Sequence, residues 1–152
     1  MFRLLKKWSL LQGSDRSMFF KIVCLTGLVR IIVLTLPFKW IARYLGWQGS
    51  ESPYAEDSAK LEVSQNIGRA IEIISRHSLW ESKCLVQAIT GKLLLRNRSI
   101  ENTLYLGVKI NEKNRLIAHA WLRVGPEIIT GVIGMGEFTT VARFADRLEH
   151  KK

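Results

Sequence analysis

The spacing of apolar residues changes near Asn97, and this change limits the possible folds of the chain more than any other feature of the sequence. Before it, apolar residues recur every three or four positions, as they do on one face of an α-helix. After it, the pattern changes to that of β-strands joined by short turns, with strands expected at residues 103–110, 115–124 and 127–133. The sequence therefore predicts an α+β fold in which helices precede an antiparallel meander.

Two helices are predicted immediately before these strands. Asp57 is a suitable N-cap for the first, which is expected to run to His77. A break at residues 78–82 separates it from the second, which is expected at about residues 83–96. The expected packing positions are Leu61, Ile67, Ala70, Ile71 and Ile74 in the first helix and Leu85, Ala88, Ile89, Leu93 and Leu94 in the second.

The N-terminal part of the chain is basic and apolar, and residues 18–38 are about long enough to cross a membrane. Lys21 and Arg30 interrupt this stretch, and an arginine in the middle of a span costs roughly 2.5–3.5 kcal/mol. We therefore expect a helix that packs on the domain and ends at Pro37, followed by a short amphipathic helix at residues 39–45. A membrane span, or contact with a membrane surface, stays open as an alternative.

The chain is expected to form one domain with a helical appendage. The boundaries expected are a basic apolar helical region at residues 1–47, a Gly-, Ser- and Pro-rich linker at 48–56, the main domain at 57–146 and a tail at 147–152. No secretory signal is expected, because Asp15 lies before the apolar stretch and no small-residue cleavage site follows it. A cytoplasmic protein is the resulting expectation.

The chain of 152 residues has a formal net charge of +10. Such a charge suits nucleic acid, an acidic membrane surface or an acidic peptide, although it is equally compatible with basic residues that only solvate the surface. The basic residues are dispersed and do not form the dense block that phosphate binding favours, so nucleic acid is not expected as a partner. The two cysteines have no CxxC spacing, so neither a disulfide nor a metal site is expected, and no cofactor is implied.

Cys84 lies where a reactive thiol would be expected. Ser82 is a plausible N-cap, so Cys84 would occupy the first turn of the second helix, where the positive end of the helix favours a thiolate. The alternative for any single cysteine is a buried and inert apolar side chain. We expect that alternative for Cys24, which lies in an apolar run with no cap before it.

His119 lies within the second predicted strand, among apolar neighbours. An imidazole in such a strand needs a polar partner, and on local evidence a core histidine bonded to a backbone carbonyl is the commoner case. His77 and His150, at a helix end and near the terminus, are expected to be surface residues.

Three blocks of sequence in order raise the significance of Cys84 and His119. The blocks are Trp80-x3-Cys84-Leu85-x-Gln87-Ala88, Leu104-Tyr105-Leu106-Gly107-Val108 and Ala118-His119-Ala120-Trp121-Leu122. In content and spacing they resemble the leader peptidases of lasso peptide biosynthesis, the B2 proteins, over residues 80–131. The resemblance implies a papain- or transglutaminase-like core in which a nucleophile helix packs on an antiparallel sheet.

The same resemblance implies a cysteine protease that removes the leader from a ribosomally made precursor. Cys84 would attack the scissile carbonyl, His119 would act as its base, and amides at the start of the Cys84 helix would bind the oxyanion. Gln87 and Trp80 are the candidates for a further donor. The implied partners are the precursor peptide, a separate leader-binding B1 protein and an ATP-dependent macrolactam cyclase, with residues 1–47 as a docking surface for a partner, the leader or a membrane.

An acidic residue that orients the histidine belongs to the family pattern, and this sequence departs from it. Thr130 is the polar residue expected nearest the level of His119 on the returning strand, and it is the candidate third member. Glu127 is expected at the turn, about 16–20 Å from His119 along the strand at ~3.3 Å per residue, which is too far for a hydrogen bond to the ring. A backbone carbonyl or Asp146 folding back are the alternatives for this role.

Two other classes of function stay open. An acyltransferase or amidase on the same fold would use the same two residues, since hydrolysis and acyl transfer share an acyl-enzyme. A non-catalytic, membrane-associated helical protein would account for the charge and for residues 18–38, but it would leave the Cys84 and His119 blocks unexplained.

Overall fold

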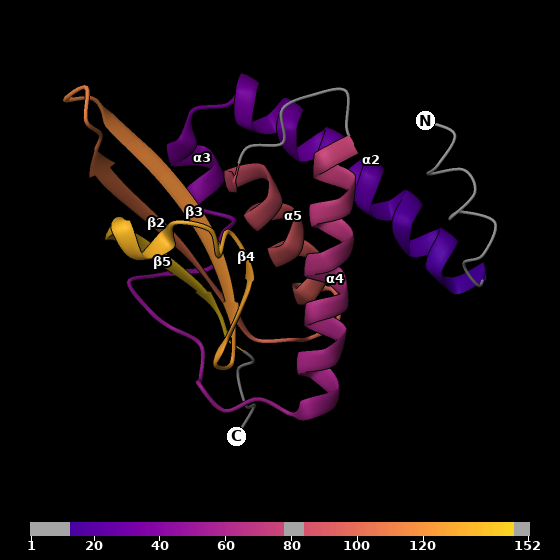
Figure 1. Ribbon diagram of the computed structural model, residues 1–152. Helices are drawn as coiled ribbons and strands as arrows, with labels where there is room; N and C mark the ends of the chain where they lie inside the picture. Colours follow the sequence, from indigo (N-terminus) through magenta and orange to yellow (C-terminus); the bar gives the residue numbers. More distant parts are fainter. Residues whose placement is uncertain (1–12, 78–83, 148–152) are drawn as a thin grey trace.

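The computed structural model describes residues 13–77 and 84–147 (Figure 1). The helices are α2 (Gly13–Thr35), α3 (Phe38–Ala42), α4 (Ser58–His77) and α5 (Cys84–Arg96), with a short 3₁₀ helix, η1 (Met135–Glu137). The strands are β1 (Trp47–Gln48), β2 (Asn102–Ile110), β3 (Leu116–Val124), β4 (Glu127–Thr130) and β5 (Thr139–Asp146). A sheet forms one layer, α5 and α4 pack against it, and α2 packs on α5 and α4 away from the sheet. The α+β prediction is confirmed.

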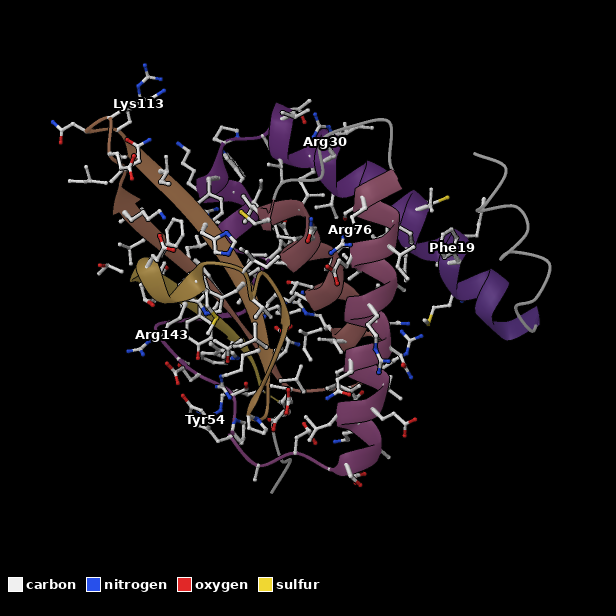
Figure 2. All side chains as sticks on the ribbon, viewed as in Figure 1. Phe19, Arg30, Tyr54, Arg76, Lys113 and Arg143 are labelled. Atoms are coloured by element: carbon white, nitrogen blue, oxygen red, sulfur yellow. The ribbon has the colours of Figure 1, made fainter. Side chains whose placement is uncertain are left out.

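The sheet is antiparallel throughout, with strand order β1-β5-β2-β3-β4. The predicted meander corresponds to β2, β3 and β4, although β4 ends at Thr130, three residues earlier than expected. The β2–β3 hairpin extends beyond the helices, with Lys113 at its tip (Figure 2). The sequence pattern did not predict β5, which lies between β1 and β2 and forms the second ladder of β2.

Helix α5 is the centre of the fold. The sheet covers one side of it and α2 covers another, so most of its residues from Val86 to Leu95 are buried. Gly91 allows close packing on β3, because a Cβ at that position would lie 2.8 Å from the Leu122 side chain. This placement fixes where the first residue of the helix, Cys84, meets the sheet.

Lys92 of α5 is buried completely, which is unusual for an ammonium group. Its Nζ donates to Asn102 Oδ1 at 2.9 Å and to the Phe144 carbonyl at 3.1 Å, and it pairs with Asp146 Oδ2 at 3.1 Å. Burial lowers the pKa of Lys92 to about 8, while the Asp146 carboxylate opposes this shift. The network ties α5 to β2 and β5.

Helix α4 crosses the edge strand β4. Asp57 caps it as predicted, since its Oδ1 accepts a hydrogen bond from the Ala59 amide at 3.3 Å. At Gly68 the helix comes so close that a Cβ would lie 2.4 Å from the Ile129 carbonyl oxygen. Helix α4 therefore covers the edge of the sheet along this stretch. Its residues also form one wall of a cavity at the end of β4.

The segment predicted as a linker lies on the sheet. The buried guanidinium of Arg123 donates to the Ser52 carbonyl at 2.7 Å and to the Pro53 carbonyl at 3.3 Å, and it stacks over the Tyr54 ring. At the start of this segment, β1 pairs with β5. These contacts hold residues 47–54 against the same sheet that carries β3.

Helix α2 packs on the domain as predicted, with Ile22, Thr26 and Val29 buried. It ends at Thr35, shortly before Pro37. By length and composition alone, residues 17–35 of this helix could also cross a membrane.

Candidate active site

A cavity of about 340 Å³ lies where α4, α5, β3 and the end of β4 meet. Cys84, His119 and Thr130, the three residues selected from the sequence, all line this cavity. The rest of the lining comes from Gly68, Glu72, Ser75, Arg76, Gln87, Ile129, Gly131, Val132 and Ile133. The fold thus brings a thiol and an imidazole from separate elements to one hollow.

Cys84 is half-buried and begins α5. The first amides of a helix have no acceptor within the helix, and the helix dipole places partial positive charge at this end. Within the described part of α5, the first turn carries no acidic residue to oppose that field. The position therefore suits a nucleophilic sulfur. The predicted cap Ser82 and the candidate donor Trp80 lie outside the described residues.

Cys24 differs from the prediction. It was expected to be buried, but it is exposed on the surface of α2, because the buried side of that helix is formed by Ile22, Thr26 and Val29. Cys24 does not line the cavity that contains Cys84. Both cysteines are free thiols, so no disulfide joins them.

The His119 ring is held by a backbone atom. Its Nε2 lies 2.8 Å from the Gly131 carbonyl oxygen. A carbonyl can only accept a hydrogen bond, so this contact assigns the hydrogen of a neutral ring to Nε2. Nδ1 is then left with a lone pair, as a base for a neighbouring thiol requires.

Gly131 can make this contact because it is glycine. Its φ is +77°, and a Cβ there would lie 2.3 Å from the Ala120 carbonyl oxygen and 2.9 Å from the Trp121 Cα. The chain leaves β4 here and stays close to β3, after a register shift between Leu122 and Arg123. A larger residue would push the carbonyl away from the imidazole.

Two aromatic rings pack near the His119 side chain. Its ring centroid lies 6.0 Å from that of Trp121 and 5.0 Å from that of Phe138. Trp121 in turn stacks on Tyr105, and the Lys109 ammonium lies over Phe138. Phe138 follows η1, a part of the chain to which the sequence pattern assigned no role.

The three side chains considered for orienting His119 have other surroundings. Thr130 is opposite Leu122 in the ladder, and its buried Oγ1 has no hydrogen-bond partner in the described part of the chain. Glu127 is opposite Val124, at the turn. Asp146 is paired with Lys92 and Arg96. The ring's bond to Gly131 corresponds to the remaining alternative, a backbone carbonyl.

Gln87 lines the cavity together with Cys84 and His119. It lies one helical turn beyond Cys84, so both side chains are on the same side of α5. Its amide can donate hydrogen bonds, as an oxyanion requires. Gln87 is therefore kept as a candidate for the further donor.

The set of groups in the cavity supports acyl chemistry through a thiol. It contains a thiol at a helix N-terminus, an imidazole whose Nδ1 keeps its lone pair, and amide donors beside the thiol.

Comparison with known proteins is consistent with this chemistry. No curated protein and no solved structure matches the chain. A family model described as the transglutaminase-like superfamily matches residues 32–143, well over half of the chain, and that superfamily generally comprises cysteine-based enzymes. The match includes α5 with Cys84, β3 with His119, and all of the sheet except the last residues of β5. The chain therefore belongs to the transglutaminase-like superfamily.

Proposed function

We propose that this protein is a cysteine endopeptidase that removes the leader from a ribosomally synthesised lasso peptide precursor. The observation that carries the proposal is that Cys84 and His119 line one cavity while the Gly131 carbonyl holds the imidazole. The three sequence blocks that resemble lasso leader peptidases, at residues 80–88, 104–108 and 118–122, supply the substrate class.

The reaction begins with transfer of the Cys84 proton to Nδ1 of His119. The Cys84 sulfur then attacks the scissile carbonyl carbon, and amides at the start of α5 stabilise the oxyanion. Collapse breaks the C–N bond, and His119 gives its proton to the leaving amine, which is the first residue of the core peptide. Water, deprotonated by His119, hydrolyses the thioester, releases the leader with a free carboxylate and restores the Cys84 thiol.

A separate leader-binding protein belongs to this proposal. The cavity of about 340 Å³ can hold only a few side chains around the scissile bond. Cleavage at one bond of one peptide therefore needs recognition elsewhere, which a partner that presents the leader would supply. The macrolactam cyclase acts on the product of this step, the core peptide with a free amine.

The test is incubation with a candidate precursor and its leader-binding protein, followed by mass spectrometry. We expect two products, a core peptide with a free amine and a leader with a free carboxylate. Cys84→Ala should give neither, while Cys24→Ala, the matched control, should cleave at the wild-type rate. A leader whose new end carries an added amine or alcohol would identify an acyltransferase and reject the protease. Cleavage by Cys84→Ala would reject Cys84 as the nucleophile.

A further inference from the structure

Helix α2 has apolar residues on its solvent side as well as on its packed side. Ile22, Thr26 and Val29 form the buried stripe. The opposite stripe contains Phe20, Cys24, Leu28, Ile31 and Leu34, all exposed. A helix that covers a soluble domain normally presents polar residues to water, so this exposed stripe indicates a surface that contacts something apolar.

The apolar surface continues beyond α2. Exposed apolar residues precede α3 (Leu36), lie within it (Trp40) and follow it (Tyr44 and Trp47). Next to them is an apolar groove of about 570 Å³ between α2, α3 and α5, lined in part by Leu36, Trp40 and Tyr44. We call these exposed residues of α2, α3 and positions 36–47 the apolar-basic face. Figure 1 shows that α2 and its connection to α3 lie on the outside of the molecule.

The charges of this segment are of one sign. Residues 17–50 contain Lys21, Arg30, Lys39 and Arg43 and no acidic residue. The Arg43 guanidinium lies 5.3 Å from the centroid of the Trp40 ring, so a cation and an aromatic ring are presented together. Figure 2 shows Arg30 on the C-terminal half of α2. Apolar side chains combined with Trp, Tyr and basic residues are typical of helices that lie in a membrane interface.

We propose that the apolar-basic face binds the surface of an anionic lipid bilayer, with α2 lying in the membrane plane. A span is unsuitable while the domain is folded, because the stripe formed by Ile22, Thr26 and Val29 is buried against the protein. A second copy of the chain is disfavoured, since two such faces would bring together the basic residues of positions 17–50, a segment that contains no acidic residue. Anionic headgroups supply the complementary charge, and the acyl region accepts the exposed stripe.

The test uses the full-length protein and sedimentation with vesicles of phosphatidylcholine alone or with phosphatidylglycerol. We expect binding to the anionic vesicles that weakens as salt is raised, and much weaker binding to neutral vesicles. The triple variant Leu28→Ser, Ile31→Ser, Leu34→Ser should lower the partition coefficient about tenfold or more, because it removes apolar area from the contact. These side chains are 54%, 60% and 71% exposed, so the fold should be retained.

A second triple variant is the matched control. Ile110→Ser, Leu116→Ser and Val141→Ser change side chains that are 67%, 70% and 59% exposed on the sheet, and should leave vesicle binding unchanged. Folding of all variants is checked by circular dichroism. Absence of binding to anionic vesicles, or equal binding by the two triple variants, would overturn the proposal. Protection of α2 from protease in membranes, together with a need for detergent to extract the protein, would indicate a span and would also overturn the proposal. The same holds if the wild type does not bind vesicles while the α2 variant loses its binding to the leader-binding protein.

Discussion

His119 takes its orientation from a backbone carbonyl and two aromatic rings. A carbonyl fixes the ring and its tautomer, but it stabilises an imidazolium less than a carboxylate does. The position of the Gly131 backbone therefore matters more to this site than the chemistry of any third side chain. Two substitutions separate these contributions.

Gly131→Ala should slow cleavage at least about tenfold, because a Cβ at this position collides with the Ala120 carbonyl and the oxygen that holds His119 must move. Initial cleavage rates measure the effect. Gly134→Ala is the matched control: its φ is +74°, similar to the +77° of Gly131, but nothing lies within 4 Å of the added Cβ. Equal losses for the two variants would show that backbone strain alone is responsible, and an unchanged Gly131→Ala rate would show that the carbonyl does not orient the ring.

Thr130→Val should leave the cleavage rate within about twofold of the wild type. The Thr130 Oγ1 is buried without a partner among the described residues, and replacing such a hydroxyl by a methyl of similar shape is neutral or stabilising. Thermal unfolding should therefore show an equal or higher midpoint. A fall in rate of tenfold or more in a stable Thr130→Val protein would restore Thr130 as the residue that orients His119.

At the scale of elements, the sequence predicts what depends on local pattern. The periodicity locates α4 and α5, and the turn residues separate β2 from β3 and β3 from β4. β5 has a weaker signal, because its first residues are exposed on both faces and Arg143 interrupts the apolar pattern. Its place between β1 and β2 depends on pairing between distant parts of the chain, which local periodicity does not report.

In the candidate site, too, the sequence predicts only what depends on local pattern. Cys84 and His119 follow from their sequence blocks and from the expected start of a helix. The contact between His119 and Gly131 does not follow from the sequence, because it depends on a register shift between Leu122 and Arg123 and on the left-handed conformation of Gly131. Counting residues back from the hairpin turn assumes a regular ladder, and this ladder is irregular.

Lys92 in α5 makes stability depend on pH in a defined direction. Burial lowers its pKa to about 8 in the folded protein, whereas a lysine in an unfolded chain keeps the ordinary pKa of 10.5. Below about pH 8 Lys92 is protonated in both the folded and the unfolded chain, so its contribution to the free energy of unfolding does not change with pH. Between pH 8 and 10.5 only the unfolded chain holds the proton, so the free energy of unfolding rises with pH.

The comparison that isolates this effect is wild type against Lys92→Met, by urea denaturation from pH 7 to 10.5. Relative to the variant, the wild type should gain stability on the order of 3 kcal/mol across this range, from about 1.4 kcal/mol per pKa unit. Other groups titrate in both proteins and cancel in the difference. Parallel stability curves for the two proteins would show that Lys92 is not titrating with a lowered pKa.

At the scale of the whole molecule, the arrangement of layers produces the site. The sheet and α2 enclose α5, and α4 covers β4, so the first turn of α5 and the end of β4 meet beside His119. The apolar-basic face belongs to α2, which lies on the outer side of α5 from the sheet, and to α3, whose Phe38 ring contacts Phe144 of β5. Membrane contact at that face would leave the substrate cavity, formed by other elements, available to a peptide.

The central claim is that Cys84 and His119, from different elements, act as one catalytic unit. A double-mutant cycle of Cys84→Ala and His119→Ala tests it through the rate of precursor cleavage, with folding checked by circular dichroism. Residues that act as a unit are strongly non-additive, so each single variant should lose nearly as much activity as the double variant. Losses that multiply, or a folded His119→Ala protein that cleaves at the wild-type rate, would contradict the claim.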